Sequence, residues 1–151
     1  MDDPIPRFRD SKIQRLSSTN DDGFLHGDVT ERIIGIAIEV HRNLGPGFLE
    51  SLYESAFAIE MNRRGMSFRR QLSHQIQYKG IEIGTHRIDL VVEDKVVVEL
   101  KSVKNLEDIH TAILLSYLKA SSLEVGLIIN FAAPIVKIKR VARTAGKITA
   151  E

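Results

Sequence analysis

The chain contains no cysteine among its 151 residues. Disulfide bonds and thiolate metal sites are therefore excluded, and a cytoplasmic location is the expectation. No apolar run approaches the roughly 20 residues that a membrane-spanning helix needs, so we expect no association with a membrane. The first residues also lack the basic and apolar regions of a signal peptide.

An excess of charge of one sign is missing as well, since 21 Lys and Arg face 20 Asp and Glu and the net charge is +1. A global electrostatic field therefore does not argue for nucleic acid as a partner. The basic residues nevertheless gather in two clusters, which are Arg63, Arg64, Arg69 and Arg70, and Lys137, Lys139, Arg140, Arg143 and Lys147. Either cluster is compatible with phosphate contacts, although each taken singly is more typical of a solvated face.

What the sequence does contain is an apolar segment with charges at fixed positions, Arg87-Ile-Asp89-Leu-Val-Val-Glu-Asp-Lys-Val-Val-Val-Glu99-Leu-Lys101. Asp89 lies near the start of one apolar run, and Glu99-Leu-Lys101 closes the next. The polar residues between the runs predict a β-hairpin. Charges are costly in such a place unless they are paired or bind a metal. Asp89, Glu99 and Lys101 are therefore the first candidate functional cluster.

Strand alternation leaves two registers open for this hairpin. One face, with Ile88, Leu90 and Val92 opposite Val96, Val98 and Leu100, is wholly apolar and must face a core. A three-residue tip over 93–95 places Asp89 opposite Glu99, with Cβ atoms about 5 Å apart, which is destabilising unless a positive charge lies between them. A tip shifted by one residue places Asp89 opposite Lys101, in an ordinary structural salt bridge. The alternation alone does not choose between these registers.

The remaining patterns predict a three-layer α/β domain. Helices are expected from Asp28 or Thr30 to about 43, over 48–64 and over 107–120. Strands are expected over 68–78, 81–92, 96–103, 125–131 and 135–142. Strands buried on both faces require helices on both sides of the sheet, and the passage from 99 to 131 predicts a right-handed parallel crossover. Residues 1–27 are expected to be a flexible polar leader, 28–143 the domain and 144–151 a short basic tail.

A second candidate cluster is Gly47-Phe-Leu-Glu50-Ser-Leu-Tyr53, in which Glu50 and Tyr53 share one helix face. By itself, Glu50 in a first helical turn is a placement that the helix dipole favours. Tyr53 is by itself a core aromatic residue with a satisfied hydroxyl group.

The third candidate cluster lies on the helix expected over 107–120, where Tyr117 follows Ile113 by four residues on the same face. His110 and Lys119 of this helix are able to contact a phosphate, but placement on the surface is the simpler interpretation. The remaining histidines have no metal-ligand spacing, so no role is assigned to them.

Together these three segments resemble the GxxExxY protein family, a branch of the PD-(D/E)xK nuclease superfamily. Gly47 to Tyr53 is similar to the motif that names the family. Asp89 with Glu99-Leu-Lys101 is similar to the Asp…Glu-x-Lys signature of the superfamily. The segments Leu114-Leu-Ser-Tyr117-Leu-Lys119 and Val125-Gly-Leu-Ile-Ile-Asn130-Phe131 are also similar to those of the family. The likeness covers about residues 29–143.

The resemblance implies a restriction-endonuclease-like core, a mixed sheet flanked by helices. It implies that Asp89, Glu99 and Glu50 bind Mg²⁺ or Mn²⁺, ions that suit hard carboxylate oxygens. Lys101 is implied to assist the hydrolytic water, and Tyr53 and Tyr117 are supporting residues. The partner implied is DNA or RNA, and the resemblance is compatible with a homodimer.

One position departs from the family pattern, because Ile113 stands where the family often has a glutamine. We therefore expect a metal-dependent nuclease that hydrolyses phosphodiester bonds, and keep two alternatives. The first is a nuclease-fold module that binds nucleic acid or a protein with little or no catalysis. The second is an interaction domain whose hairpin carries a structural salt bridge.

Overall fold

The computed structural model describes residues 25–144 and 147–150. Its elements are, in chain order, α2 (Gly27–Leu44), α3 (Glu50–Arg63), β1 (Phe68–Tyr78), β2 (Ile81–Val92), β3 (Val96–Lys101), α4 (Asp108–Ser121), β4 (Val125–Asn130), β5 (Lys137–Thr144) and β6 (Lys147–Ala150). The leader expected over 1–27 falls almost wholly outside the described residues. Most other expected elements occur with ends that differ by a residue or two, as is usual for element boundaries.

The strands form one six-stranded mixed sheet in the order β1-β2-β3-β4-β5-β6. Neighbouring strands are antiparallel except for β3 and β4, which run parallel with Lys101 aligned to Asn130. The helix α4 connects these two strands, so the predicted parallel crossover is confirmed. Strand β6 was not expected, because it lies in the segment assigned to a C-terminal tail, where it pairs with β5.

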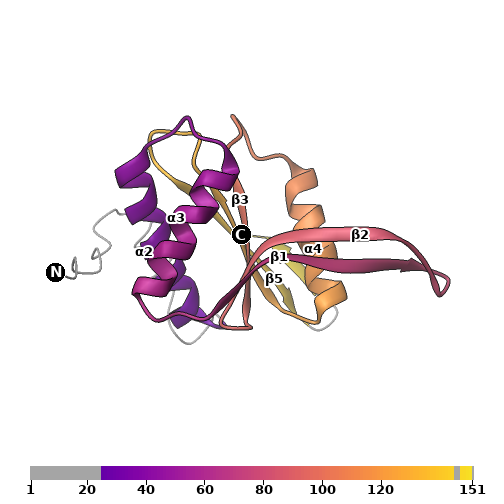
Figure 1. Cartoon of the computed structure of the whole chain (residues 1–151). Coiled ribbons are helices and arrows are strands. Elements are labelled where there is room, and N and C mark those ends of the chain that lie inside the picture. Colours follow the sequence, from indigo (N-terminus) through magenta and orange to yellow (C-terminus); the bar gives the residue numbers. More distant parts are fainter. Residues whose placement is uncertain (1–24, 145–146, 151) are drawn as a thin grey trace.

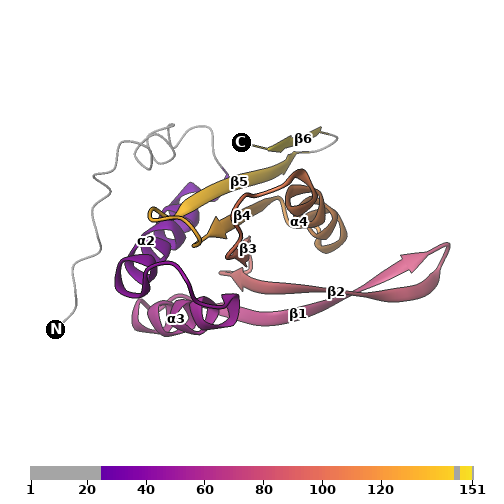
Figure 2. The ribbon, with the colours of Figure 1, turned by 90° about the horizontal axis from the view of Figure 1, so that it is seen from above.

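Helices α2 and α3 cover one face of the sheet and α4 covers the other (Figures 1 and 2). The larger core lies between the sheet and the first two helices, and a smaller core lies beneath α4. Strand β3 divides its side chains between them, since Val96, Val98 and Leu100 belong to the larger core and Val97 to the smaller one. This arrangement confirms the three-layer α/β fold. None of the described helices is both long and apolar enough to cross a membrane.

The hairpin tip consists of the three residues 93–95, because Val92 pairs with Val96. This is the first of the two registers that the alternation left open. Strand β2 pairs with β3 only at Leu90–Val98, Val91–Val97 and Val92–Val96, whereas it pairs with β1 along its length. Beyond Leu90 the two strands therefore separate, and the β1–β2 ribbon continues past the sheet as a projecting arm (Figures 1 and 2). We call this separation the fork, and the projecting ribbon the arm.

The alternation expected for β2 is wrong at Ile88. This residue packs in the smaller core beneath α4, whereas Leu90 and Val92 pack in the larger core. The change of side occurs at Asp89, where β2 leaves β3. A strand that is released from one neighbour is free to twist more strongly, so simple alternation does not carry through the fork.

Candidate active site

The fork brings Asp89 and Glu99 together. Asp89 lies opposite Glu99, one position beyond the last paired residues. Glu99 Oε1 accepts a hydrogen bond from the Asp89 N–H at 3.2 Å, and Asp89 Oδ2 accepts one from the Leu100 N–H at 2.9 Å. The side chains thus satisfy backbone donors that the separating strands no longer pair. The register with Asp89 opposite Lys101 is not adopted.

Both carboxylates at the fork titrate above their ordinary range. Burial, reinforced by the charge of Asp89, raises the pKa of Glu99 to about 7. Burial also raises the pKa of Asp89, against the opposing effect of the hydrogen bond from Leu100. The nearby charge of Lys101 lowers the pKa of both groups. A deprotonated pair in this position is mutually repulsive, and a cation between the two groups would relieve the repulsion.

Lys101 is the last residue of β3 and is partly buried. Its carbonyl oxygen accepts a hydrogen bond from the Phe131 N–H at 2.9 Å, which fixes the end of β3 against the segment after β4. Within the part of the chain that the structure describes, Lys101 belongs to none of the ion pairs. Among the described residues, its ammonium group therefore forms no ion pair with a carboxylate.

Tyr53 of α3 acts as a structural anchor. It is fully buried, and its ring stacks on Phe131 with centroids 4.2 Å apart. Its hydroxyl donates to the Gly45 carbonyl at 2.6 Å and accepts from the Phe48 N–H at 3.3 Å. Tyr53 therefore holds the loop that leads into α3, which explains why a tyrosine at this spacing fixes the first turn of that helix.

Glu50 is the first residue of α3, and its Oε1 accepts a hydrogen bond from the Ser102 N–H at 3.2 Å. It thus reaches the end of β3, and its charge contributes to the raised pKa of Glu99. Nevertheless, residues 25–144 and 147–150 contain no group of three or more His, Asp or Glu arranged to hold a metal ion. Two of the three predicted carboxylates, Asp89 and Glu99, are adjacent, and the third, Glu50, lies at the end of β3.

The Asp89–Glu99 pair fits Mg²⁺ or Mn²⁺ in its chemistry. Its donors are hard oxygens, and they are desolvated and mutually repulsive. Mg²⁺ is commonly held by one or two carboxylates while it keeps several waters or takes oxygens of a substrate phosphate. A third protein carboxylate is therefore not required for this ion.

Sequence reasoning missed a second network, which is centred on Glu54 of α3. The Glu54 side chain is buried and accepts hydrogen bonds from Arg70 Nη2 at 2.9 Å and from the Gln71 amide. The same amide donates to Asp89 Oδ1 at 3.3 Å. Glu54 follows Glu50 by four residues, so helical spacing is the signal that could have found it.

Gln71 is unusual because it lies within a strand with φ of 50°. A residue other than glycine in this left-handed region is strained, and such strain often accompanies a functional constraint. The β1–β2 pairing skips Gln71, between Arg70–Leu90 and Leu72–Ile88. The backbone thus turns the amide toward Asp89 and Glu54, and no pattern in the sequence indicated this.

Tyr117 of α4 lies on the other side of the fork. It is buried, and its ring lies 5.8 Å from that of His74 and 6.1 Å from that of His86. Burial raises the pKa of its hydroxyl group, and the charge of Glu99 adds to this effect against that of Arg69. Tyr117 therefore lies between the carboxylate pair, whose Glu99 affects its pKa, and the two histidines of the arm that its ring contacts.

Two other positions of α4 have simpler outcomes. His110 forms a capping box with Glu107, in which His110 Nδ1 accepts the Glu107 N–H at 2.9 Å. Ile113, in the position of the family glutamine, is 38% exposed. Neither residue adds a polar group to the fork.

Comparison with known proteins identifies the superfamily and the fold. Residues 27–141 match the model of the PD-(D/E)XK nuclease superfamily. Among solved structures, the crystal structure of SSO0001 is similar with a TM-score of 0.50 and 15% identity, over 63% of this chain and 50% of that one. The chain thus spans half the length of that protein, and the likeness concerns the fold. No curated protein matches the chain. With most of its length covered by the superfamily model, this chain belongs to the PD-(D/E)XK nuclease superfamily.

Proposed function

We propose that this protein is a divalent-metal-dependent nuclease that hydrolyses phosphodiester bonds of nucleic acid at the Asp89–Glu99 fork. The observation that carries the proposal is the pairing of the buried Glu99 with the half-buried Asp89 near the end of β3, with Lys101 two residues after Glu99. The motif from Gly47 to Tyr53 supports the finer assignment to the GxxExxY branch. Superfamily membership supports the reaction class.

Each residue has a role in this proposal. Asp89 and Glu99 hold Mg²⁺ or Mn²⁺, and Glu50 supplies a further carboxylate from α3. The bound ion supplies Lewis acidity at the phosphate and offsets its negative charge. Lys101 orients the attacking water, or stabilises the negative charge that develops on the phosphate oxygens. Tyr53 and Tyr117 support the site by fixing the α3 loop and the α4 side of the fork.

Metal binding is the first test, by calorimetric titration of Mg²⁺ and Mn²⁺ at pH 8, above the pKa of Glu99. The native protein is expected to bind near millimolar metal and Asp89→Asn to lose the binding. Asp94→Asn is a matched control, because Asp94 is an exposed carboxylate of the hairpin turn, where it pairs with Arg69 of β1. Absence of binding by the native protein would sink the proposal.

Cleavage is the second test, on mixed single- and double-stranded DNA and RNA substrates. Lys101→Ala is expected to abolish cleavage while metal binding persists, because Lys101 acts on the water or the phosphate and is not a ligand of the metal ion. Equal cleavage by Lys101→Ala and the native protein would remove Lys101 from the proposed mechanism.

A second candidate function is a nuclease-fold module that binds nucleic acid or a protein without hydrolysis. Two observations favour it: no third ligand joins the carboxylate pair among the described residues, and the apolar Ile113 occupies the position of the family glutamine. This candidate predicts salt-sensitive binding that does not need metal. Binding without cleavage at every metal concentration would establish it in place of the nuclease.

A further inference from the structure

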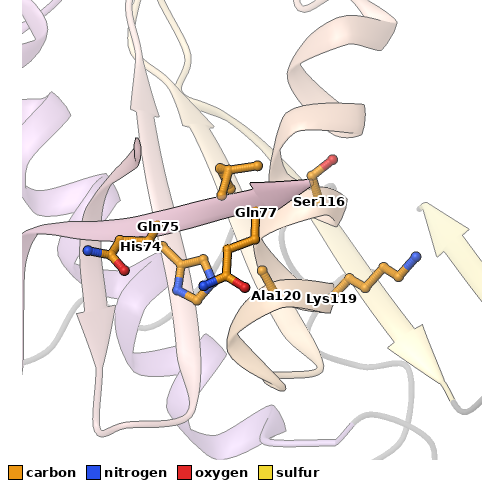
Figure 3. A pocket seen from close by; sticks show the side chains of 7 residues that line it. His74, Gln75, Gln77, Ser116, Lys119 and Ala120 are labelled. Atoms are coloured by element: carbon orange, nitrogen blue, oxygen red, sulfur yellow. The ribbon is translucent and has the colours of Figure 1, made fainter. Parts of the chain in front are cut away.

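A cavity of about 820 Å³ lies between the arm and α4. Residues 74–77 of β1 line one side, and Ser116, Lys119 and Ala120 of α4 line the other. Figure 3 shows His74 and Gln77 turned toward Ala120, whereas the side chain of Lys119 extends to the other side of Ala120, at the edge of the cavity. The α4 residues are spaced at i, i+3 and i+4, so a single helix face forms that side. We call this cavity the arm–α4 groove.

The groove lies further along the same two elements that border the carboxylate pair. Gln71 of β1 donates a hydrogen bond to Asp89, and His74, the first groove residue, follows it by only three positions, or about 10 Å of extended strand. From the helix side, the ring of Tyr117 lies 5.8 Å from that of His74. The same two elements, β1 and α4, therefore lead from the fork into the groove.

The lining has the chemistry of a site for an anionic, hydrogen-bonding ligand. It offers the amide group of Gln77, the imidazole of His74, the hydroxyl of Ser116 and the ammonium group of Lys119, and no carboxylate is among its residues. Strand β1 is also an edge of the sheet, so one side of its backbone has no strand partner among the described residues. Amide side chains and backbone groups of this kind hydrogen-bond to the edges of unpaired bases, and a positive charge contacts phosphate.

The size of the groove suits a short stretch of one strand. Its volume of about 820 Å³ lies in the range of about 300–1,000 Å³ that is typical of small-molecule sites. A space of this size accommodates a few nucleotides of one strand.

We propose that the arm–α4 groove binds single-stranded nucleic acid and leads the strand to Asp89 and Glu99. The delivery of the strand to the carboxylates rests on the proposed nuclease function, whereas the binding does not. Lys119 contacts a phosphate, and Gln77 contacts a base edge.

Binding is tested with the intact protein in EDTA, by fluorescence anisotropy of labelled dT and rU oligonucleotides over a range of salt concentrations. Lys119→Glu is expected to weaken binding about tenfold or more. It should also reduce the salt dependence, by about 0.7 in log–log slope for each phosphate of the single strand that the variant no longer neutralises. Lys95→Glu makes the same change of charge in the hairpin turn, at the opposite end of β3 from the fork, and is expected to bind as the native protein does. Gln77→Ala is expected to weaken binding without a change of slope.

The outcomes separate the groove from the nuclease. Native binding that Lys119→Glu and Lys95→Glu affect equally would overturn the groove proposal, and so would no binding of single strands or a preference for duplex. Groove-dependent binding by a protein that never cleaves would support the groove and overturn the nuclease. Cleavage by the native protein with an unchanged KM in Lys119→Glu would overturn the groove and leave the nuclease.

Discussion

Asp89 and Glu99 exchange backbone contacts at the point where β2 leaves β3, since Glu99 accepts the Asp89 N–H and Asp89 accepts the N–H that follows Glu99. The separation of the strands leaves donors unpaired, and the two carboxylates satisfy them from inside the fork. The same separation releases the arm that borders the arm–α4 groove. One irregularity in the sheet thus accounts for the position of the candidate site and of the groove beside it.

The metal-free protein is expected to lose stability as pH rises. Glu99 has a pKa of about 7 in the folded protein against 4.5 for an ordinary glutamate, so the folded state holds the extra proton between these values. Stability is therefore greatest below about pH 4.5 for this group and falls as pH rises through 7. Glu99→Gln removes the effect, and its advantage over the native protein should grow to at most about 3 kcal/mol at pH 8. Urea unfolding in EDTA at pH 5, 6, 7 and 8 measures this difference. The prediction would be contradicted if the free energies of unfolding of the two proteins changed with pH in parallel.

Divalent metal is expected to reverse this loss. At ten times its dissociation constant, bound Mg²⁺ or Mn²⁺ stabilises the folded state by about 1.4 kcal/mol. The rise in melting temperature should be large at pH 8 and small at pH 6, because protonated Glu99 does not bind a cation. Asp89→Asn should show no rise, while Asp94→Asn should behave as the native protein. An equal rise in all three proteins would indicate non-specific binding.

Gln71→Ala is expected to weaken metal binding, because the amide no longer holds Asp89 Oδ1. Loss of a group that orients a ligand typically reduces metal affinity about 10- to 100-fold. Gln71→Gly removes the same amide but relieves the left-handed backbone, so it should be more stable than Gln71→Ala by about 1 kcal/mol. If both variants bind the metal equally and more weakly than the native protein, but differ in stability, Gln71 has a positioning role. Native affinity in both would exclude this role.

Tyr53→Phe is expected to destabilise the fold by about 1–3 kcal/mol. The ring still stacks on Phe131, but the Gly45 carbonyl and the Phe48 N–H lose their buried partner. Thermal unfolding measures the effect, and Tyr78→Phe is the control because Tyr78 is exposed on the arm. Unfolding temperatures that are lowered equally by both substitutions would argue against an anchoring role for the Tyr53 hydroxyl.

Several features of the fold follow from local patterns. The order of the elements and the parallel crossover depend on apolar periodicity and on turn residues that are neighbours in sequence. Alternation restricted Asp89 to two partners, Glu99 or Lys101. It failed at Ile88, because it takes no account of a strand that leaves its neighbour and twists.

The basic cluster from Arg63 to Arg70 shows a different limit. In the folded protein Arg64 pairs with Glu60, Arg69 with Asp94 and Arg70 with Glu54. A count of charges along the chain does not reveal these partners, which lie up to 25 positions away in the case of Asp94. The cluster is therefore largely a set of ion pairs, and the lysine that lines the groove, Lys119, belongs to neither basic cluster.

The sequence by itself singled out Asp89, Glu99, Lys101 and Glu50 as candidates, because the first three occur at fixed positions of an apolar hairpin and Glu50 lies in the neighbouring helix motif. Only the tertiary structure decided how they meet. The fork, the raised pKa of Glu99, the contact of Gln71 with Asp89 and the groove beneath the arm all arise from segments that are distant in sequence. Burial and electrostatic repulsion depend on the groups around a side chain in space, and the pattern of residues along one strand does not predict which groups those are.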